Sequence, residues 1–456
     1  MYQEAAARER VLEKIRDRSR SRLRTRFETL RLGVMSATRN CNPVLFQAVV
    51  FVSAFLIIFS RRPDAILNAQ FFAEDGQRWY ADAYHFGLRC LLMPDELGGY
   101  LHTVPRCIAL FTLLFPLSLA PLVMNLCAVA IQILPASFFL SSRFAAVPFG
   151  QRLLGSALYF ALPNTYEVNA NATTIQWHLG LLAFLVLVAH PASGWKWRLF
   201  DGTVLLLISL ESPIGVLLVP IAAILWWIRK TSWQRNSLAV LVPGAIVQTS
   251  IILLSHLRPS APNGANLHRL ISILGGQVFL SSLVGNWTLL VIVRRHFPDY
   301  LFFRETIAFV VGLALLTYAL RYGPVALKLV IVFAFGVLAL SLIRPQPTNR
   351  PLPQWELLSL PRAGNRYYYL PSIAFIAALV WIVSNRTRLR PIRWIAVLVF
   401  LLLPIGVVRD WQYPPFIDLH FREYCSRFDE ALPGTTVVIP INPQPWTMKL
   451  TKHQAH

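Results

Sequence analysis

Residues 44–60 read VLFQAVVFVSAFLIIFS, a run without a charged side chain. Further apolar blocks follow along the chain at residues 199–210, 213–228, 237–254, 307–320, 325–342, 368–383 and 395–408. Each block covers roughly 12–18 residues and, with its flanks, approaches the ~20 residues that cross a bilayer core as a helix. The chain is therefore predicted to cross a membrane several times.

The composition excludes a soluble globular protein. Hydrophobic residues make up 55% of the chain, charged residues 14%, and the mean hydropathy is +0.51; a soluble fold cannot bury that much apolar surface. The blocks show no alternation with a period of two residues, so they predict helices and not the strands of an outer-membrane barrel. We predict an all-α fold, a polytopic transmembrane helical bundle of roughly 10–13 helices over residues 44–409.

Charge predicts the orientation. Eleven Lys or Arg residues precede residue 44, and the positive-inside rule places this basic segment, residues 1–43, in the cytoplasm. The sequence favours a solvated tail that sets the topology, and a basic amphipathic helix on anionic membrane lipid is the alternative. No aromatic interleaving accompanies the arginines, so we expect no nucleic-acid partner. Because no small-residue cleavage site follows Ser60, the first helix is expected to stay as an anchor.

A second basic cluster is likewise expected in the cytoplasm: Arg386, Arg388, Arg390 and Arg393. Counting spans from both clusters places three segments together on the opposite face, which in a bacterium is the periplasmic face of the inner membrane: residues 61–105, 344–366 and 410–456. The side of residues 163–178 stays open, because Pro116 and Pro121 either separate two helices or kink one.

The first of these outward segments carries two adjacent carboxylates, Glu74 and Asp75, followed by Gly76. Aromatic residues flank them, so we expect a partly desolvated acidic site just past a membrane helix. Desolvation and mutual repulsion raise the pKa of carboxyl groups, which makes a better general base near neutral pH. The spacing alone equally allows Glu74 to cap a short interfacial helix while Asp75 meets water.

Polar motifs follow the acidic pair in a fixed order. They are Ala83-Tyr84, Gly99-Tyr100-Leu101-His102, Pro105-Arg106, then Pro163, Glu167, Asn169-Ala170-Asn171 and Gln176-Trp177, then Asn365-Arg366-Tyr367-Tyr368-Tyr369 and finally residues 440–448. In order and wording, these stretches resemble the GT-C superfamily of membrane glycosyltransferases, and most closely bacterial multi-pass members that use a polyprenyl-phosphate-linked sugar. The resemblance spans nearly the whole chain. An extra acidic pair, Asp95-Glu96, departs from the pattern and leaves open which carboxylates act.

The resemblance implies an inverting glycosyltransferase. Such an enzyme moves a sugar from a polyprenyl-phosphate carrier to a glycan or lipid acceptor in the periplasm or the outer leaflet. It implies that Asp75 is the general base for the acceptor hydroxyl, and that Glu74 orients the acceptor or joins a metal site. No cofactor is certain, although two adjacent carboxylates suit Mg²⁺ or Mn²⁺. Neither the sugar nor the acceptor is given by the sequence.

The other motifs are expected to supply the substrate-binding residues. Arg106 and Arg366 offer a planar fork to the donor's phosphate, although an arginine at a helix end also commonly reaches to the interface; Arg350 and Arg362 are weaker candidates. The remaining predicted substrate-binding residues are Tyr100, His102, Glu167, Asn171, Gln176, Trp177, Asn365 and Tyr367. Polar groups are costly in lipid, so these should line a cavity. The alternatives are an ordinary hydrogen-bonding role for His102 and a place in the interfacial aromatic belt for Trp177.

The tail after Arg409 changes character. Residues 419–432 predict a short amphipathic helix, Pro433-Gly434 a turn, and residues 435–439 a strand. Residues 410–456 are therefore expected to form a small extramembrane α/β cap. A segment of this size is too small for a catalytic domain of its own, and we expect it to pack over the active-site face.

Other classes of protein stay open. A transporter or flippase of lipid-linked sugars would also be polytopic and basic, but it would place broken polar segments in corresponding positions of two halves. A polysaccharide polymerase or ligase usually relies on arginine-rich outer loops. A purely structural assembly protein would leave the ordered polar motifs without a purpose.

Overall fold

The computed structural model describes residues 42–96, 98–255, 262–286, 298–345, 352–385 and 389–454. Nearly all of the basic segment 1–43 lies outside the described residues, as do Arg350, Arg386 and Arg388. The chain divides into two compact units, Met1–Ser53 and Ala54–His456. The first contains the beginning of helix α2 (Pro43–Arg61), and the second contains the other described elements.

Long apolar helices dominate the structure. Helices make up 73% of it, and eight of those described are long and apolar enough to cross a membrane. They are α2, η3 with α6 (Leu117–Leu140), α11 (Ser232–Leu254), α12 to α13 (Leu267–Val284), Phe302–Tyr322 of α15, α16 (Val325–Ile343), α18 (Asn365–Ser384) and α19 with α20 (Arg390–Arg409). The predicted helical chain with many membrane-length apolar helices is confirmed, and the number of spans and their orientation stay predictions.

Shorter elements connect and extend these helices. Three are apolar: α5 (Thr103–Thr112), α8 (Ile175–Val188) and α10 (Ile214–Arg229). The others before the C-terminal segment are α3 (Asp64–Leu67), η1 (Asp75–Tyr80), α4 (Ala81–Phe86), η2 (Gly87–Leu92), η4 (Ser142–Phe144), α7 (Phe149–Ala161), η5 (Tyr166–Val168), α9 (Trp195–Glu211) and α17 (Gln354–Ser359). Within the long helices, α12 covers Leu267–Ile271, η6 Ser272–Leu280, α13 Ser281–Val284, α15 Pro298–Tyr322, α19 Arg390–Phe400 and α20 Leu403–Arg409.

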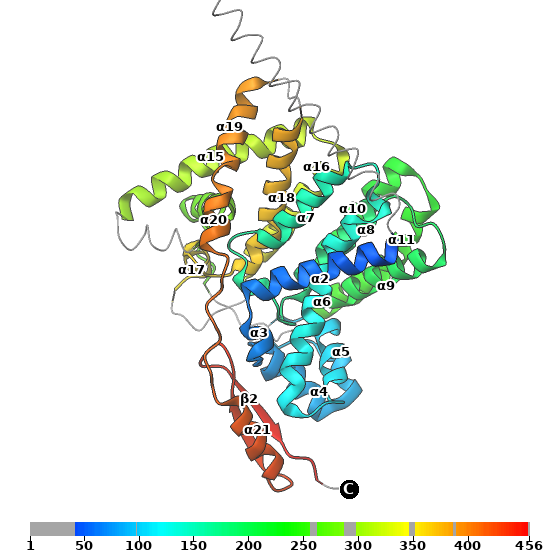
Figure 1. Cartoon of the computed structure of the whole chain (residues 1–456), viewed down its shortest axis with the longest axis vertical. Helices are drawn as coiled ribbons and strands as arrows, with labels where there is room; N and C mark the ends of the chain where they lie inside the picture. Colours follow the sequence, from blue (N-terminus) through cyan, green and yellow to red (C-terminus); the bar gives the residue numbers. More distant parts are fainter. Residues whose placement is uncertain are drawn as a thin grey trace, which may run out of the picture. The chain divides into compact units, whose positions relative to one another are not determined.

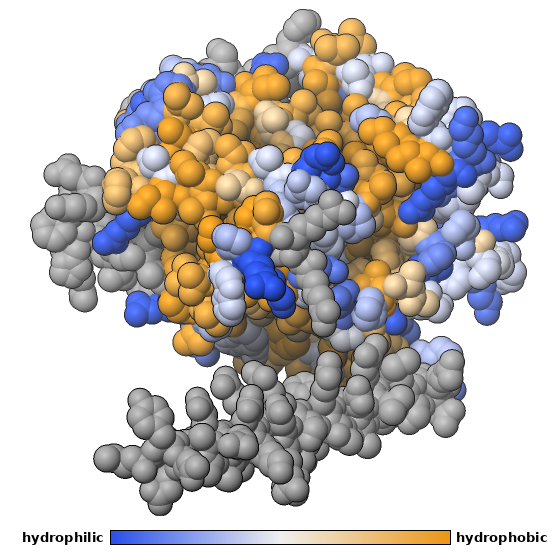
Figure 2. Space-filling view, turned by 90° about the horizontal axis from the view of Figure 1, so that it is seen from above, coloured by the Kyte–Doolittle hydropathy of each residue, from blue (hydrophilic) through white to orange (hydrophobic). Residues whose placement is uncertain are grey.

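The helices expose large hydrophobic side chains. Leu114, Trp227 and Val408 are 77%, 74% and 77% exposed, and Figure 2 shows hydrophobic residues over much of one face, with hydrophilic residues between and beside them. Such exposure is unfavourable in water and normal in lipid. It agrees with a membrane protein.

Helix α8 forms the centre of the packing around the predicted site. From Leu179 onward it is apolar on all sides, and 12 of its 14 residues are buried, as expected for a helix without a polar face. Its neighbours are α6, α9, α10 and α18. The segment that leads into α8, residues 163–174, is therefore held at the end of a packed helix.

Pro116 and Pro121 separate two helices. Helix α5 ends at Thr112, Pro116 directly precedes η3, and Pro121 lies in the first turn of α6, where a missing N–H costs nothing. Residues 172 and 173 then contact Asp75 through hydrogen bonds. Residues 172 and 173 thus lie beside the acidic loop, and the side of the membrane on which residues 163–178 lie stays a prediction.

The C-terminal segment forms the predicted small α/β unit. Helix α21 (Phe421–Glu430) packs on strand β1 (Thr436–Pro440), which pairs antiparallel with β2 (Thr447–Thr451) (Figure 1). The second strand was not predicted. The backbone N–H of Asn442 donates to Phe71 O at 3.1 Å, and that of Ala73 donates to Asn442 O at 2.5 Å. The cap is therefore tied to the loop immediately before Glu74.

Candidate functional site

The acidic pair lies at the start of η1, where the chain is tightly enclosed. Ala73 has a left-handed backbone, with φ of 48°. A Cβ at Gly76 would lie 2.8 Å from Phe71 Cβ and 3.1 Å from the Ile441 side chain of the cap. Glycine at this position lets the loop and the cap pack closely around Glu74 and Asp75.

Asp75 is buried and anchored to the segment before α8. Its side chain accepts hydrogen bonds from the Thr173 hydroxyl at 2.7 Å and the Ala172 backbone N–H at 3.1 Å, and the residue is 1% exposed. Burial raises the pKa of Asp75 to about 7, although these hydrogen bonds lower it. Each carboxylate oxygen accepts more than one hydrogen bond, so Asp75 keeps acceptor capacity and titrates in the range useful for a general base.

Glu74 is half-buried and faces positive charge. Burial raises the pKa of Glu74 above its usual range, and the nearby Arg366 guanidinium lowers it. Glu74 is thus the more accessible member of the pair, and Asp75 the more firmly held one.

Arg366 lies at the start of α18 and forms an ion pair with Glu167 of η5. Its backbone N–H also donates to Glu167 Oε2 at 3.1 Å, and its guanidinium lies over the Tyr367 ring at 4.9 Å. Two predicted substrate-binding residues, from segments about 200 positions apart in sequence, thereby meet beside Glu74. The arrangement places one fixed positive charge at the edge of the acidic pair.

Trp177 contacts Tyr367 edge to face, with ring centroids 6.0 Å apart. Trp177 is 4% exposed, and its indole N–H has no hydrogen-bond partner among the described residues. A buried donor without a partner is unusual. Trp177 is therefore packed inside the protein next to Tyr367 and Arg366. It does not lie on the surface, where a residue of the interfacial aromatic belt would lie.

Arg106 is held inside the first loop. Its guanidinium donates to the backbone oxygens of Cys90 and Met93 and to Asp82 Oδ2 at 3.0 Å, and the residue is 1% exposed. These partners account for most of its donors. The structure does not bring Arg106 to the acidic pair as a free phosphate-binding group.

The second acidic pair is engaged by Arg78. Arg78 lies 3.0 Å from Asp95 Oδ1 and 3.4 Å from Glu96 Oε2, and Asp95 also accepts the Gly98 N–H. These contacts fix the turn that leads to Gly99. They give Asp95 a structural role in this turn.

His102 and Tyr100 pack with Trp79 on another side of the loop. The His102 ring lies 4.6 Å from Tyr100 and 4.7 Å from Trp79, and His102 Nδ1 lies 3.4 Å from Glu211 Oε1. Glu211 also accepts the Val104 N–H at 2.6 Å. An ordinary hydrogen-bonding role for His102, the alternative weighed from the sequence, is what this geometry provides.

Asn171 shapes the loop that holds Asp75. Its Oδ1 accepts from the Thr174 N–H and hydroxyl at 3.1 and 2.8 Å, and its Nδ2 donates to Glu167 O at 2.8 Å. Gln176 is buried at the start of α8. Both residues lie close in sequence to Thr173 and support the segment that carries it.

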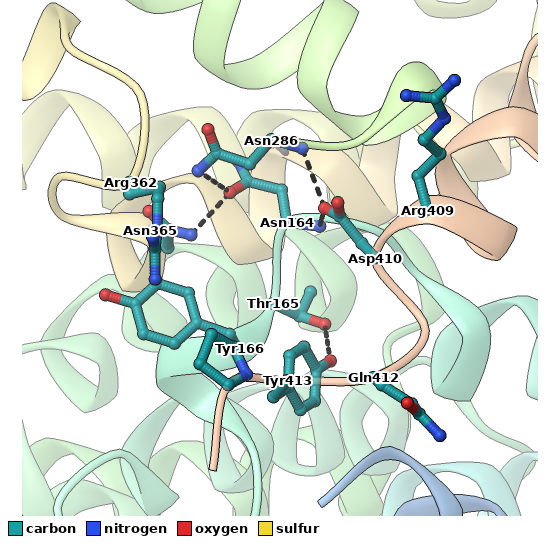
Figure 3. Close-up of a pocket in the computed structure, with 11 residues that line it drawn as sticks. Asn164, Thr165, Tyr166, Asn286, Arg362, Asn365, Arg409, Asp410, Gln412 and Tyr413 are labelled. Carbon is teal, nitrogen blue, oxygen red and sulfur yellow. Dashed lines mark hydrogen bonds between the residues drawn. The ribbon is translucent and has the colours of Figure 1, made fainter. Parts of the chain in front are cut away.

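Asn365 belongs to a separate polar cluster (Figure 3). Its Nδ2 donates to Asn164 Oδ1 at 2.5 Å, and Asn286 Nδ2 donates to the same oxygen at 2.8 Å. Asp410 Oδ2 accepts the backbone N–H groups of Asn164 and Asn286 at 2.9 and 2.8 Å. The cluster lines a cavity of about 380 Å³ together with Thr165, Tyr166, Arg362, Arg409, Gln412, Tyr413 and Pro414.

Sequence reasoning missed Thr173, Asn286, Asp410 and the role of Asn164. Thr173 and Asn164 border motif residues, so their neighbours in sequence were a usable signal. Asn286 and Asp410 stand just beyond α13 and α20. A polar residue at the end of an apolar helix is too common at membrane interfaces to single them out.

The acidic pair supplies some oxygen ligands for the expected Mg²⁺ or Mn²⁺, but too few for a complete metal site. Glu74, Asp75 and the Thr173 hydroxyl are available oxygens, but the described residues contain no group of three or more His, Cys, Asp and Glu side chains placed to hold a metal ion. Arg366 lowers the pKa of Glu74, while its guanidinium pairs with Glu167. The divalent cation stays a prediction from the carboxylate pair alone.

A comparison of the chain with protein-family models, with curated proteins and with solved structures finds no match. The resemblance to GT-C enzymes stays a prediction. The function of the chain has to be inferred from the residues of its own site.

Proposed function

We propose that the chain is an inverting glycosyltransferase that takes a sugar from a polyprenyl-phosphate carrier. One observation carries the proposal: the buried Asp75 carboxyl, with its pKa raised to about 7, adjoins the half-buried Glu74, which faces the Arg366–Glu167 ion pair. A poised base beside a fixed positive charge suits a reaction that removes a proton and releases a phosphate. The acceptor is a glycan or lipid at the same membrane face.

In the proposed step, the Asp75 carboxylate takes the proton of the acceptor hydroxyl, and that oxygen forms a bond to the anomeric carbon of the sugar. The bond from the anomeric carbon to the phosphate oxygen breaks, and the polyprenyl phosphate leaves with the electron pair. Attack from the side opposite the leaving group inverts the anomeric configuration.

Glu74 and Arg366 would position the reactants. Glu74 is more exposed than the buried Asp75 and would accept a hydrogen bond from a second hydroxyl of the acceptor. Arg366 would stabilise the negative charge that grows on the leaving phosphate. Its pairing with Glu167 fixes the guanidinium, which is the preorganisation that such stabilisation needs.

Whether the lipid-linked donor is cleaved distinguishes a glycosyltransferase from a flippase and from a polymerase or ligase. Purified protein in liposomes would receive a polyprenyl-phosphate sugar labelled in the sugar, together with membrane and glycan fractions as acceptors. We expect labelled sugar to move to the acceptor, with one polyprenyl phosphate released per sugar. Transfer of the intact labelled lipid between leaflets, without cleavage, would instead show a flippase, and joining of whole glycan chains would show a polymerase or ligase.

A further inference from the structure

A second cavity, of about 520 Å³, lies beside helix α8. Helices α6, α7, α8, α16 and α18, all labelled in Figure 1, contribute to its walls. Most of the side chains that line it are apolar, and they include Phe139, Leu181, Phe184, Val330, Ile373 and Trp381. The volume lies within the ~300–1,000 Å³ range of small-molecule sites, and the apolar wall offers few hydrogen-bond partners to water.

The cavity is long enough for one chain of a lipid. Along α18 its lining extends from Ile373 to Ser384, a rise of about 16 Å at 1.5 Å per residue. This is about half of the ~30 Å hydrocarbon core of a bilayer, the depth of one leaflet. Phe139, Val330 and Trp381 are half-buried and leave apolar surface uncovered. A hydrocarbon chain would cover this surface.

Polar groups meet at one end of the cavity, where α8 ends. Arg229, at the end of α10, donates to the backbone oxygens of Val188 and Ala189 at 3.0 and 3.3 Å, and His190 follows directly. The backbone N–H of His190 donates to Arg143 O at 3.1 Å. His190 and Arg229 are both exposed, and both line the cavity.

The charged groups of the lining leave a net positive charge at this end. Arg143 is buried and paired with Asp201 at 2.8 Å, so that pair is neutral. Arg229 has no ion-pair partner in the described part of the chain, and its two bonds to backbone oxygens use two of the five guanidinium N–H groups. His190 adds an imidazole N–H. The described lining contains no carboxylate, so this end suits a phosphate group.

The positive end lies far from the acidic pair. Helix α8 begins next to the residues that bind Asp75, and its 14 residues rise about 20 Å before it ends beside Arg229. A phosphate held by Arg229 would therefore not be the leaving group of the proposed reaction. Asn385, which also lines the cavity, directly precedes the basic cluster that is predicted to be cytoplasmic. By that predicted orientation, the positive end belongs to the cytoplasmic leaflet.

We infer that this cavity binds an anionic phospholipid, with one acyl chain against α7, α8 and α18 and the phosphate at Arg229 and His190. This lipid site goes beyond the proposed glycosyl transfer and does not depend on it. An acyl chain gains little by moving from a bilayer to an equally apolar cavity, so the charge of the head group sets the selectivity. One basic side chain near an anionic lipid contributes ~1 kcal/mol, which is about fivefold in affinity.

Native mass spectrometry of the purified, delipidated full chain measures lipid retention without any donor or turnover. The probes are phosphatidylglycerol and phosphatidylcholine with identical acyl chains, added in equal amounts. Wild type should retain phosphatidylglycerol in preference by about fivefold, and Arg229→Gln should retain both lipids equally. The control Arg198→Gln removes an exposed arginine of α9 that does not line the cavity, and it should keep the wild-type preference. Equal retention of the two lipids by wild type, or the wild-type preference in Arg229→Gln, would overturn the lipid site.

Two further variants test the charge and the cavity separately. Arg229→Lys keeps the positive charge and should keep the preference for phosphatidylglycerol, which tests the charge even if Arg229→Gln does not fold. Ala377→Phe places a ring in the cavity and should lose most of the retained lipid, whichever head group it has. Ala157→Phe, at an exposed position of α7 outside the cavity lining, should retain lipid as wild type does. Lipid retention by Ala377→Phe equal to that of Ala157→Phe would contradict an acyl chain in this cavity.

Two other occupants of the cavity predict different results. If the cavity holds the chain of the sugar donor, polyprenyl phosphate at equal concentration would displace phosphatidylglycerol from wild type. If a second copy of this protein covers the cavity, wild type would appear as a dimer without bound lipid, and Ala377→Phe would appear as a monomer. Either result would overturn the phospholipid site and leave the proposed activity untouched.

Discussion

Replacing Asp75 with Asn should lower the turnover of sugar transfer by roughly 10²–10⁴-fold, the contribution that a positioned general base makes. Asparagine has nearly the same shape: its Oδ1 can accept from the Ala172 N–H, and its NH₂ group can donate to the Thr173 hydroxyl, which accepts as well as donates, so the loop should stay in place. Donor KM should change little, because the carboxylate acts on the acceptor proton. The measurement is sugar transferred per minute by equal amounts of purified wild-type and variant protein.

The pH profile gives this prediction a second readout. The ionised form of Asp75 is the base, and a pKa of about 7 means that half of it is ionised near pH 7 and most of it about one pH unit higher. Wild-type turnover should therefore rise about tenfold per pH unit below pH 7 and level off above it. Asp75→Asn should lose that rise, while the exposed cap variant Asp429→Asn should keep wild-type turnover and profile. A full loss in Glu74→Gln, with Asp75→Asn near wild type, would move the base to Glu74.

Asp410→Ala should destabilise the protein by about 1–3 kcal/mol for each buried N–H group that it leaves without an acceptor. The two groups are the backbone N–H of Asn164 and of Asn286, both bound to Asp410 Oδ2. Since Asn164 and Asn286 come from segments 122 positions apart, their contact should loosen as well. The measurement is the thermal midpoint of unfolding of the detergent-solubilised protein, followed by intrinsic fluorescence.

Two control variants are compared with Asp410→Ala. Asp410→Asn keeps one oxygen acceptor and should lower the midpoint less than alanine does. Asp429→Ala, at an exposed position of α21, should leave it unchanged. If Asp410→Ala unfolds at the same temperature as Asp429→Ala, the carboxylate does not hold this cluster together.

The apolar runs predicted the helices because lipid leaves a chain few other ways to pair its backbone groups. The residues at which the helices begin and end were harder to predict. Helix α8 is only 14 residues long and largely buried. Its length matched no membrane span, yet it positions the segment that holds Asp75. Strand β2 reads Thr-Met-Lys-Leu-Thr and lacks the run of β-branched residues that marks β1, Thr-Val-Val-Ile-Pro, although the two strands have the same length.

The acidic pair was predictable because its two members are adjacent in sequence, and its surroundings were not. Asp75 is anchored by residues 97 and 98 positions away, and Asn365 meets Asn164 across 201 positions. A single sequence carries no signal for such pairings. Arg106 was predicted to bind phosphate because it precedes an apolar run. In the structure its guanidinium instead donates hydrogen bonds to Cys90, Met93 and Asp82.

The most direct test of the central claim is the release of polyprenyl phosphate by the double variant Glu74→Gln/Asp75→Asn, because it does not depend on which carboxylate is the base. Wild-type and double-variant proteins of equal amount and equal thermal midpoint would be compared with the same labelled donor and acceptor. We predict steady release by wild type and release at the protein-free background by the double variant. Release by the double variant at the wild-type rate would contradict an active site at Glu74 and Asp75.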